Sequence, residues 1–161
     1  MNRKVMLILL FLVLNTACNE GDIDIQDVEQ YIEGNNISSP VVKKLNDEMY
    51  YIFSDKRIDV YKGGSKANTS TGSLGPDGIM TGGYEKGSFG MIINNKEVLE
   101  KARYYTLTYN NEVRIYELDF EKDNTYLIVQ DERIFNPINP DSILRFLDKD
   151  YNLLLNTNYK E

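Results

Sequence analysis

Two stretches of alternating or aromatic-rich apolar positions predict β-hairpins. The stretch at 49–61 is rich in aromatic and β-branched side chains on both sides of a polar turn at 54–57. The stretch at 104–120 is divided by Asn110-Asn111, and asparagine tolerates the positive φ angles that a two-residue turn requires. Both stretches therefore predict pairs of antiparallel strands.

The second arm of the later hairpin changes its apolar phase. Its first apolar residues are Val113 and Ile115, and the next are Tyr116, Leu118 and Phe120. Side chains alternate between the two faces of a strand, so one unbroken strand cannot place all five on the same face. The pattern therefore predicts a β-bulge near residue 115.

Other segments have apolar residues three and four positions apart, which predicts short helices. The segment 24–33 can be capped by Asp22 or Asp24 and can end at Gly34 and Asn35. The remaining candidates are residues 40–45 after Pro40, residues 96–102, and a segment from Asn139-Pro140 with Ile143, Phe146 and Leu147 as its buried stripe.

Further strands are predicted at 126–129 and 151–155. The sum is an α+β domain over residues 24–161, mostly antiparallel β, built as a small barrel or sandwich with short peripheral helices. Residues 62–90 interrupt this pattern, because they contain nine of the eleven glycines. We expect a long loop there, either disordered or a mobile hairpin, or else a loop that binds a partner.

The charge of the chain narrows the classes of partner. The formal net charge of the 161 residues is −7, and it becomes −9 without Arg3 and Lys4. Such a field repels polyanions, so a nucleic-acid partner is not expected. A basic protein partner fits the charge, and so does simple solubility.

The first 18 residues have the layout of an export signal. Arg3 and Lys4 precede ten apolar residues at 5–14, which are too few to span a bilayer, and small residues lead to Cys18. This region resembles the lipobox of bacterial lipoproteins, although Asn15 stands where that family usually has an aliphatic residue.

The resemblance implies a signal peptide at 1–17 and a lipidated tether at 18–23, attached to the membrane through Cys18. The alternative is an ordinary secretory leader with an incidental cysteine. Asn19, where inner-membrane lipoproteins of enterobacteria have aspartate, implies the cell envelope with the outer membrane favoured over the inner membrane.

Candidate catalytic chemistry is sparse. The sequence has no histidine and one cysteine, which excludes histidine-based triads and most zinc sites within it. Gly64-Ser65-Lys66 lacks the order of a phosphate-binding loop. Residues 148–152 begin like a calcium loop, but Leu153 replaces the expected glycine, so a solvated turn is favoured. We expect no metal, no cofactor and no enzymatic activity.

Two groups of side chains remain as candidates. The carboxylates of Asp119, Glu121 and Asp123 flank a turn and could serve glycoside hydrolysis, although alternation at a strand end also explains them. Tyrosines can anchor a protein or sugar partner when exposed, and the candidates for such partner binding are Tyr50, Tyr51, Tyr84, Tyr104 and Tyr105. In each adjacent pair, alternation along a strand directs one ring to each face, so we expect one ring of each pair to face outward. The alternative is that these tyrosines are amphipathic fillers of half-buried strands.

The resulting hypothesis is an envelope-tethered lipoprotein that acts by non-catalytic protein binding, as an inhibitor or immunity protein would. Two alternatives stay open. One is a structural or assembly lipoprotein of an envelope complex, and the other is a glycan-binding domain that uses exposed tyrosines.

Overall fold

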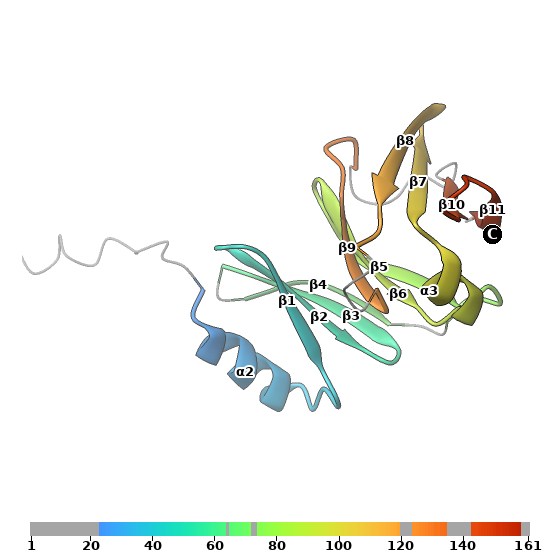
Figure 1. Cartoon of the computed structure of the whole chain (residues 1–161). Helices are drawn as coiled ribbons and strands as arrows, with labels where there is room; N and C mark the ends of the chain where they lie inside the picture. The colour runs from blue at the N-terminus through green and yellow to red at the C-terminus, as the bar shows by residue number, and fades with distance from the viewer. Residues whose placement is uncertain (1–22, 64, 72–73, 120–123, 135–142, 159–161) are drawn as a thin grey trace, which may run out of the picture.

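The computed structural model describes residues 23–63, 65–71, 74–119, 124–134 and 143–158. Within these ranges the chain forms two helices and eleven strands (Figure 1). The helices are α2 (Ile25–Gly34) and α3 (Lys96–Lys101). The strands are β1 (Val41–Asn46), β2 (Met49–Ser54), β3 (Arg57–Lys62), β4 (Ser65–Thr71), β5 (Ile79–Glu85), β6 (Ser88–Ile93), β7 (Tyr104–Tyr109), β8 (Glu112–Glu117), β9 (Tyr126–Gln130), β10 (Ile143–Leu147) and β11 (Leu153–Asn158).

The strands form three antiparallel sheets, which confirms the predicted fold class. Sheet A has the order β1-β2-β3-β4, sheet B the order β5-β6-β9, and sheet C the order β11-β10-β7-β8. Each sheet is open and has two edge strands within the described residues. Of the two architectures left open by the sequence, the structure therefore has the sandwich.

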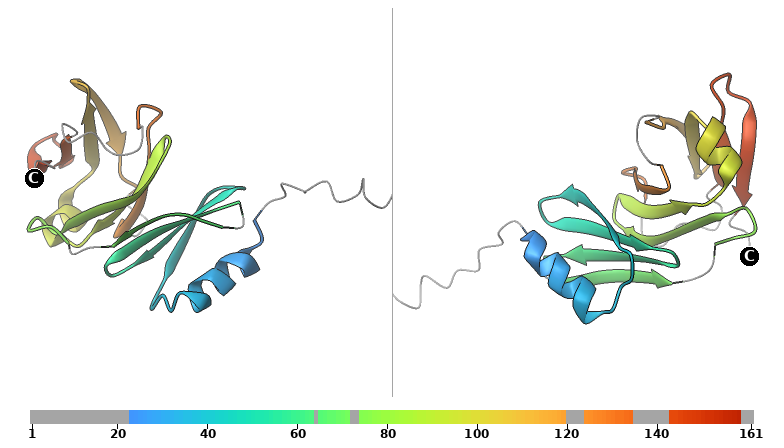
Figure 2. Two further views of the ribbon diagram at one scale, coloured as in Figure 1. Left: turned by 180° about the vertical axis from the view of Figure 1, so that it is seen from behind. Right: turned by 60° about the horizontal axis from the view of Figure 1, so that its bottom comes forward.

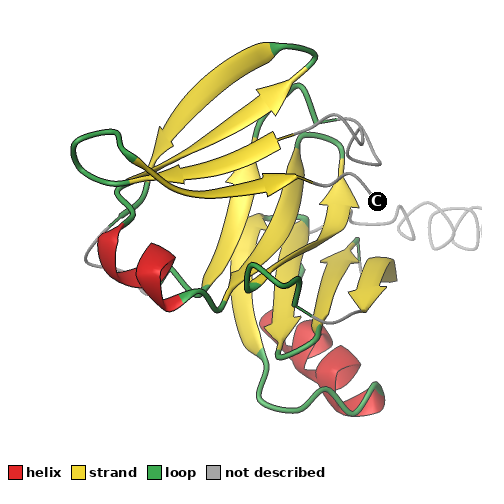
Figure 3. Cartoon of the chain, turned by 90° about the vertical axis from the view of Figure 1, so that its right-hand side faces the viewer, coloured by secondary structure: helices red, strands yellow, loops and turns green. Residues whose placement is uncertain are grey.

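The three sheets and helix α2 are stacked in layers (Figures 1 and 2). Helix α2 lies on the outer face of sheet A, the inner face of sheet A packs on sheet B, and the other face of sheet B packs on sheet C. Strand β6 is buried along its whole length because it lies in the middle of sheet B, between the other two sheets. Figure 3 shows the helices at the margins of the strands.

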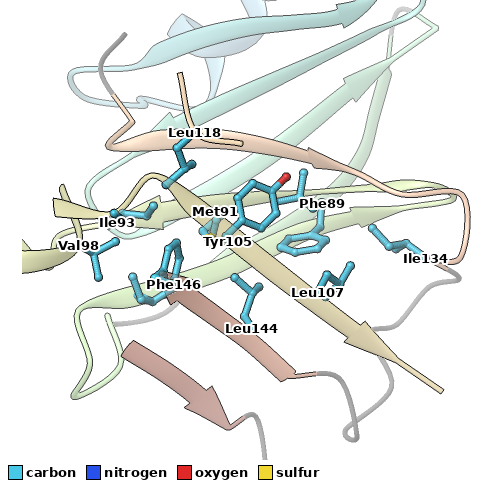
Figure 4. Close-up of a cluster of buried hydrophobic side chains, with 13 residues drawn as sticks. Phe89, Met91, Ile93, Val98, Tyr105, Leu107, Leu118, Ile134, Leu144 and Phe146 are labelled. Carbon is cyan, nitrogen blue, oxygen red and sulfur yellow. The ribbon is translucent and has the colours of Figure 1, made fainter. Parts of the chain in front are cut away.

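Two apolar clusters join the sheets. Between sheets A and B, one cluster contains Met49, Tyr51, Phe53, Ile58, Val60, Met80 and Ile92. Between sheets B and C, a larger one includes Phe89, Met91 and Ile93 of β6, Tyr105 and Leu107 of β7, and Leu144 and Phe146 of β10 (Figure 4). Alternation along β6 sends Ile92 to one cluster and Met91 and Ile93 to the other.

Helix α2 agrees with its sequence signals. The Asp24 side chain caps the helix by accepting a hydrogen bond from the Gln26 amide. Val28 is fully buried against sheet A, whereas Ile25 stays 47% exposed. Beneath the helix, the buried Asp59 carboxylate lies 2.6 Å from Nε of Arg57, and this guanidinium also donates to the Tyr31 hydroxyl.

The predicted hairpins are confirmed as β2-β3 and β7-β8. Asn110 and Asn111 adopt φ angles of 49° and 63°, as the tight turn requires. The predicted helix near 96–102 is α3, in which Lys101 pairs with Glu97 at 2.9 Å. The predicted strand at 126–129 is β9, and the one at 151–155 begins later, at Leu153.

Three predictions of local structure are wrong. Residues 40–45 and 143–147 were expected to be helical, but they form β1 and β10 because each pairs with neighbouring strands. The glycine-rich segment 62–90 was expected to be a loop, yet β4, β5 and the start of β6 lie in it. The helix start predicted at Asn139-Pro140 lies outside the described residues.

Candidate functional site: the outer face of sheet C

Exposed apolar side chains concentrate on one face of the structure. Of the five large hydrophobic residues that are exposed in the described ranges, four belong to sheet C or its connecting loop. They are Val113 (51% exposed), Ile115 (57%), Tyr151 (58%) and Leu153 (56%). Large apolar side chains gathered on one face of a folded protein typically mark an interaction surface.

Alternation along the strands places these residues on the side of sheet C that faces away from sheet B. Leu107, Leu144 and Phe146 point into the core, so their neighbours in β7 and β10 point outward. We call this surface the C face. Its members are Tyr104, Thr106, Thr108, Val113, Ile115, Glu117, Ile143, Arg145, Leu147, Tyr151 and Leu153.

The bulge predicted near residue 115 is absent from the β7-β8 pairing, which runs without a register shift from Tyr104↔Glu117 to Tyr109↔Glu112. The phase change has another cause. Tyr116 lies on the inner side of sheet C, whereas Val113 and Ile115 lie on the C face. The sequence signal thus marked two exposed apolar residues, and the mistake was to assume that all five apolar side chains had to share one face.

Tyr104 and Tyr151 form a stacked aromatic pair at one end of the C face. Their ring centroids are 4.6 Å apart with 9° between the planes. The pKa of Tyr104 is raised because its hydroxyl is hydrogen-bonded to that of Tyr151 and lies close to it. Tyr151 has a φ of 64°, a conformation that is strained for a bulky residue.

The Asp148 carboxylate holds the turn that presents Tyr151. Its Oδ1 accepts hydrogen bonds from the Asp150 amide at 2.8 Å and the Asn152 amide at 2.9 Å, and its Oδ2 accepts from the Asn152 side chain at 3.0 Å. Those hydrogen bonds lower the pKa of Asp148, with the largest contribution from the Asn152 side chain. Residues 148–152, which begin like a calcium loop in sequence, therefore form a turn closed by hydrogen bonds to the Asp148 carboxylate. No cluster of metal-binding side chains occurs in the described parts of the chain.

On the inner side of sheet C, a polar network fixes β8 against the segment after β9. The Asp131 carboxylate is fully buried and accepts a hydrogen bond of 2.6 Å from the Tyr116 hydroxyl. Arg133 donates to both oxygens of Asp131, to the Glu112 carbonyl oxygen at 2.8 Å and to the Leu107 carbonyl oxygen at 3.2 Å. The C face therefore rests on a strand whose inner side is tied in place.

The same network sets the acidity of its members. Burial by itself would raise the pKa of Asp131, but hydrogen bonds from Arg133 and Tyr116 outweigh it and lower the pKa to about 2. Burial raises the pKa of Tyr116, and its hydrogen bond to Asp131 adds to the rise. Burial also raises the pKa of Tyr105, whose ring stacks on Tyr116.

We expect Asp131→Asn to destabilise the fold by about 2 kcal/mol at pH 7, because the pKa lies at about 2 rather than the ordinary 3.8. A depressed pKa stabilises the folded state above pH 4, and the contribution is lost as the pH falls from 4 to 2. Urea unfolding from pH 7 to pH 2 measures both effects, with Glu132→Gln as a control because that neighbouring side chain is 80% exposed. Equal stability losses in the two variants would contradict the prediction.

The five tyrosines proposed as partner anchors differ in how far they are buried. Tyr50, Tyr51 and Tyr105 are buried, so they are core residues and not exposed anchors. Neither ring of the Tyr50-Tyr51 pair faces solvent, because helix α2 covers the Tyr50 side of sheet A and sheet B covers the Tyr51 side. Tyr84 is partly buried and hydrogen-bonded to Thr81 at 2.6 Å, and Tyr104 lies on the C face.

The remaining sequence candidates lie mostly outside the described residues. Asp119 is exposed at the end of β8, whereas Glu121 and Asp123 lie outside the described residues, as do Gly64 and the proposed lipid attachment site, Cys18. Neither helix in the described ranges has the length and hydrophobicity needed to cross a membrane.

Comparisons with known proteins add no relative. The chain matches no protein-family model, and neither the curated proteins nor the solved structures gave a significant match. Any functional conclusion therefore depends on the chemistry of the surfaces described above.

Proposed function

We propose that this chain is an envelope-tethered lipoprotein that acts by binding another protein through the C face, without catalysis. The observation that supports the proposal best is that, of the five large hydrophobic residues exposed in the described ranges, four lie on sheet C or its connecting loop. A surface that binds nothing gains no stability from such residues, whereas an interface is stabilised by burying them.

The composition of the C face suits recognition of a protein. The stacked rings of Tyr104 and Tyr151 provide a rigid aromatic anchor, and tyrosine is enriched among the residues that contribute most to binding. The strained backbone of Tyr151, held by Asp148, fits a side chain placed for contact rather than for local stability. Polar side chains accompany the apolar ones: Glu117 lies at the end of the edge strand β8, and Arg145 lies at the centre of the face on the inner strand β10.

The position of the C face suits a protein anchored by its N-terminus. Ile23, the first described residue, precedes α2, and α2 covers the face of the stack opposite to sheet C (Figure 1). Packed layers are about 10 Å apart, so the C face lies roughly 30 Å from the layer that contains α2. A lipid on Cys18 would leave this face free to meet a partner away from the anchoring membrane.

Net charge adds a preference for the partner. The chain carries a formal charge of −7, and opposite charge accelerates encounter between proteins. A basic protein, such as an enzyme neutralised at the envelope, therefore fits better than an acidic one. A structural role in an envelope complex would use the same face with a permanent partner.

Glycan binding is the second candidate, because one face of the exposed Tyr151 ring is available for stacking on a sugar. The two proposals differ in what should occupy the C face. A protein partner covers Val113 and Ile115 as well as the tyrosines, whereas a sugar needs the tyrosines alone.

Site-specific photocrosslinking of the full chain in its native envelope tests the proposal. With benzoylphenylalanine in place of Leu153, we expect one protein product of defined mass. The matched control places the same group at Ile25, which is also exposed but lies on α2. Equal products from both positions, or none from position 153, would overturn protein binding through the C face. Loss of the product on addition of peptidoglycan fragments would favour glycan binding.

A further inference from the structure

Strand β8 is an unusual edge for a sandwich. Of the six edge strands in the described parts of the chain, β1, β4, β5 and β11 take part in pairings with a register shift, and irregular edges resist the addition of further strands. The edge strand β9 contacts β1, and its Tyr126 carbonyl oxygen accepts a hydrogen bond from Lys43. Strand β8 is regular over its six residues, and no strand of the described ranges pairs with its outer edge.

The hairpin geometry defines which backbone groups of β8 point outward. The two-residue turn at Asn110-Asn111 makes Glu112 a hydrogen-bonded partner of Tyr109. Every second residue of β8 after Glu112 is then also hydrogen-bonded to β7 through its backbone. The same alternation continues past the strand, because the Leu118 amide donates a 2.8 Å hydrogen bond to the Arg103 carbonyl oxygen. The N–H and C=O groups of the alternate residues Val113, Ile115 and Glu117 therefore point away from β7.

The same three residues place their side chains on the C face. An added strand could therefore form backbone hydrogen bonds with β8 and contact these side chains at the same time. Val113 and Ile115 are both more than half exposed and β-branched, and β-branched pairs stabilise neighbouring strands. Glu117 is an exposed carboxylate at the end of the strand. An added antiparallel strand would therefore match apolar side chains against Val113 and Ile115 and a basic side chain against Glu117.

A second copy of the chain does not satisfy this pattern. If two copies paired antiparallel through their β8 strands with the two-fold axis at Ile115, Val113 of each copy would lie directly opposite Glu117 of the other. An axis at residue 114 would set the two Arg114 side chains opposite each other, and like charges directly opposite destabilise a sheet. The formal charge of −7 on each copy opposes the association further.

We infer that β8 is a docking edge for an extended segment of a partner protein, which extends sheet C by one antiparallel strand. The segment carries apolar residues at two alternate positions and lysine or arginine at the next alternate position. This inference rests on the proposed function, because it names how the partner of the C face is held.

The experiment removes one outward backbone donor and keeps the fold. Proline at position 115 eliminates an N–H that points away from β7, so the β7-β8 hydrogen bonds stay intact. We expect Ile115→Pro in the full chain to reduce the photocrosslink from position 153 at least tenfold. Ile115→Thr, which keeps the donor and the β-branched shape, should reduce it no more than threefold. If Ile115→Pro does not fold by circular dichroism, Glu117→Pro serves as the second variant.

Amide hydrogen exchange of the unbound chain checks the geometry without a partner. The amides of Val113, Ile115 and Glu117 should exchange at least tenfold faster than those of Arg114 and Tyr116. Uniform protection along β8 would overturn the inference.

The crosslinking outcomes separate the inference from the function on which it rests. A product from position 153 that survives both proline substitutions overturns strand addition and leaves protein binding in place. Absence of any product from position 153 overturns both. A product with twice the mass of the chain identifies a second copy and overturns the heterologous partner.

Discussion

Gly90→Ala should destabilise the protein by about 3 kcal/mol, although it adds one methyl group. A Cβ atom at Gly90 would lie 2.6 Å from Cγ2 of Ile58, 2.9 Å from Cε1 of Phe53 and 3.1 Å from Cδ1 of Tyr51. All three neighbours are fully buried in the cluster between sheets A and B. Strand β6 cannot move away, because it pairs with β5 and β9 and packs on sheet C behind it. The two sheets must therefore separate, and overpacking of this kind is costly.

Gly34→Ala is the matched control for this prediction. The same methyl group at Gly34 would meet nothing within 4 Å, and alanine is favoured over glycine in a helix by up to about 1 kcal/mol. Chemical unfolding of both variants measures the contrast. Equal stability of Gly90→Ala and the parent chain would show that the sheets are less closely packed than described.

The glycine-rich segment shows why composition alone predicts a loop where strands form. Glycine clusters usually indicate loops, but here Gly82, Gly83 and Gly90 are strand residues at which another part of the chain approaches closely. At Gly82 the obstructing atom is Cβ of Ser70 in β4, at 2.4 Å. The sequence records that a side chain is missing there, yet the reason for its absence lies in a different sheet. Only the tertiary packing distinguishes such glycines from those of a loop.

Short segments were ambiguous for a related reason. In β10, the residues Ile143, Phe146 and Leu147 fit a helical stripe, while Leu144 and Phe146 equally fit the buried face of a strand. Five residues are too few to distinguish the two periods, and pairing with β7 and β11 decides the outcome. The β7-β8 hairpin was predictable because its asparagine turn is a local signal.

The candidate surface was partly accessible from the sequence. Alternation predicts that one tyrosine of the Tyr104-Tyr105 pair faces outward, and the structure shows that Tyr105 is the inward member. The apolar phase change after Val113 and Ile115 is visible in the sequence, but the prediction drawn from it is a bulge rather than two exposed residues on an unbroken strand. Tyr151 and Leu153 were missed as surface anchors, because their exposure depends on how the turn after β10 is held by Asp148.

Cys18→Ser should release the chain from the membrane completely. If Cys18 carries two or three acyl chains as proposed, each buried CH₂ group contributes about 0.8 kcal/mol to anchoring, so a diacylated chain stays bound for long periods. Serine has no thiol to acylate, so the variant lacks the acyl chains that would hold the parent chain at the bilayer. Fractionation of the envelope should recover the variant without membranes, and mass spectrometry should find no lipid on it.

Asn19→Asp is the matched control, because it leaves the thiol in place and alters only the residue after it. We expect this variant to keep its lipid and to move from the outer to the inner membrane in a density gradient, as the resemblance to enterobacterial lipoproteins implies. Cys18→Ser that still floats with membranes would contradict the tether and would require the domain to bind them by another surface. In that case the C face, with its exposed apolar side chains, would have to be tested against lipid vesicles before protein partners.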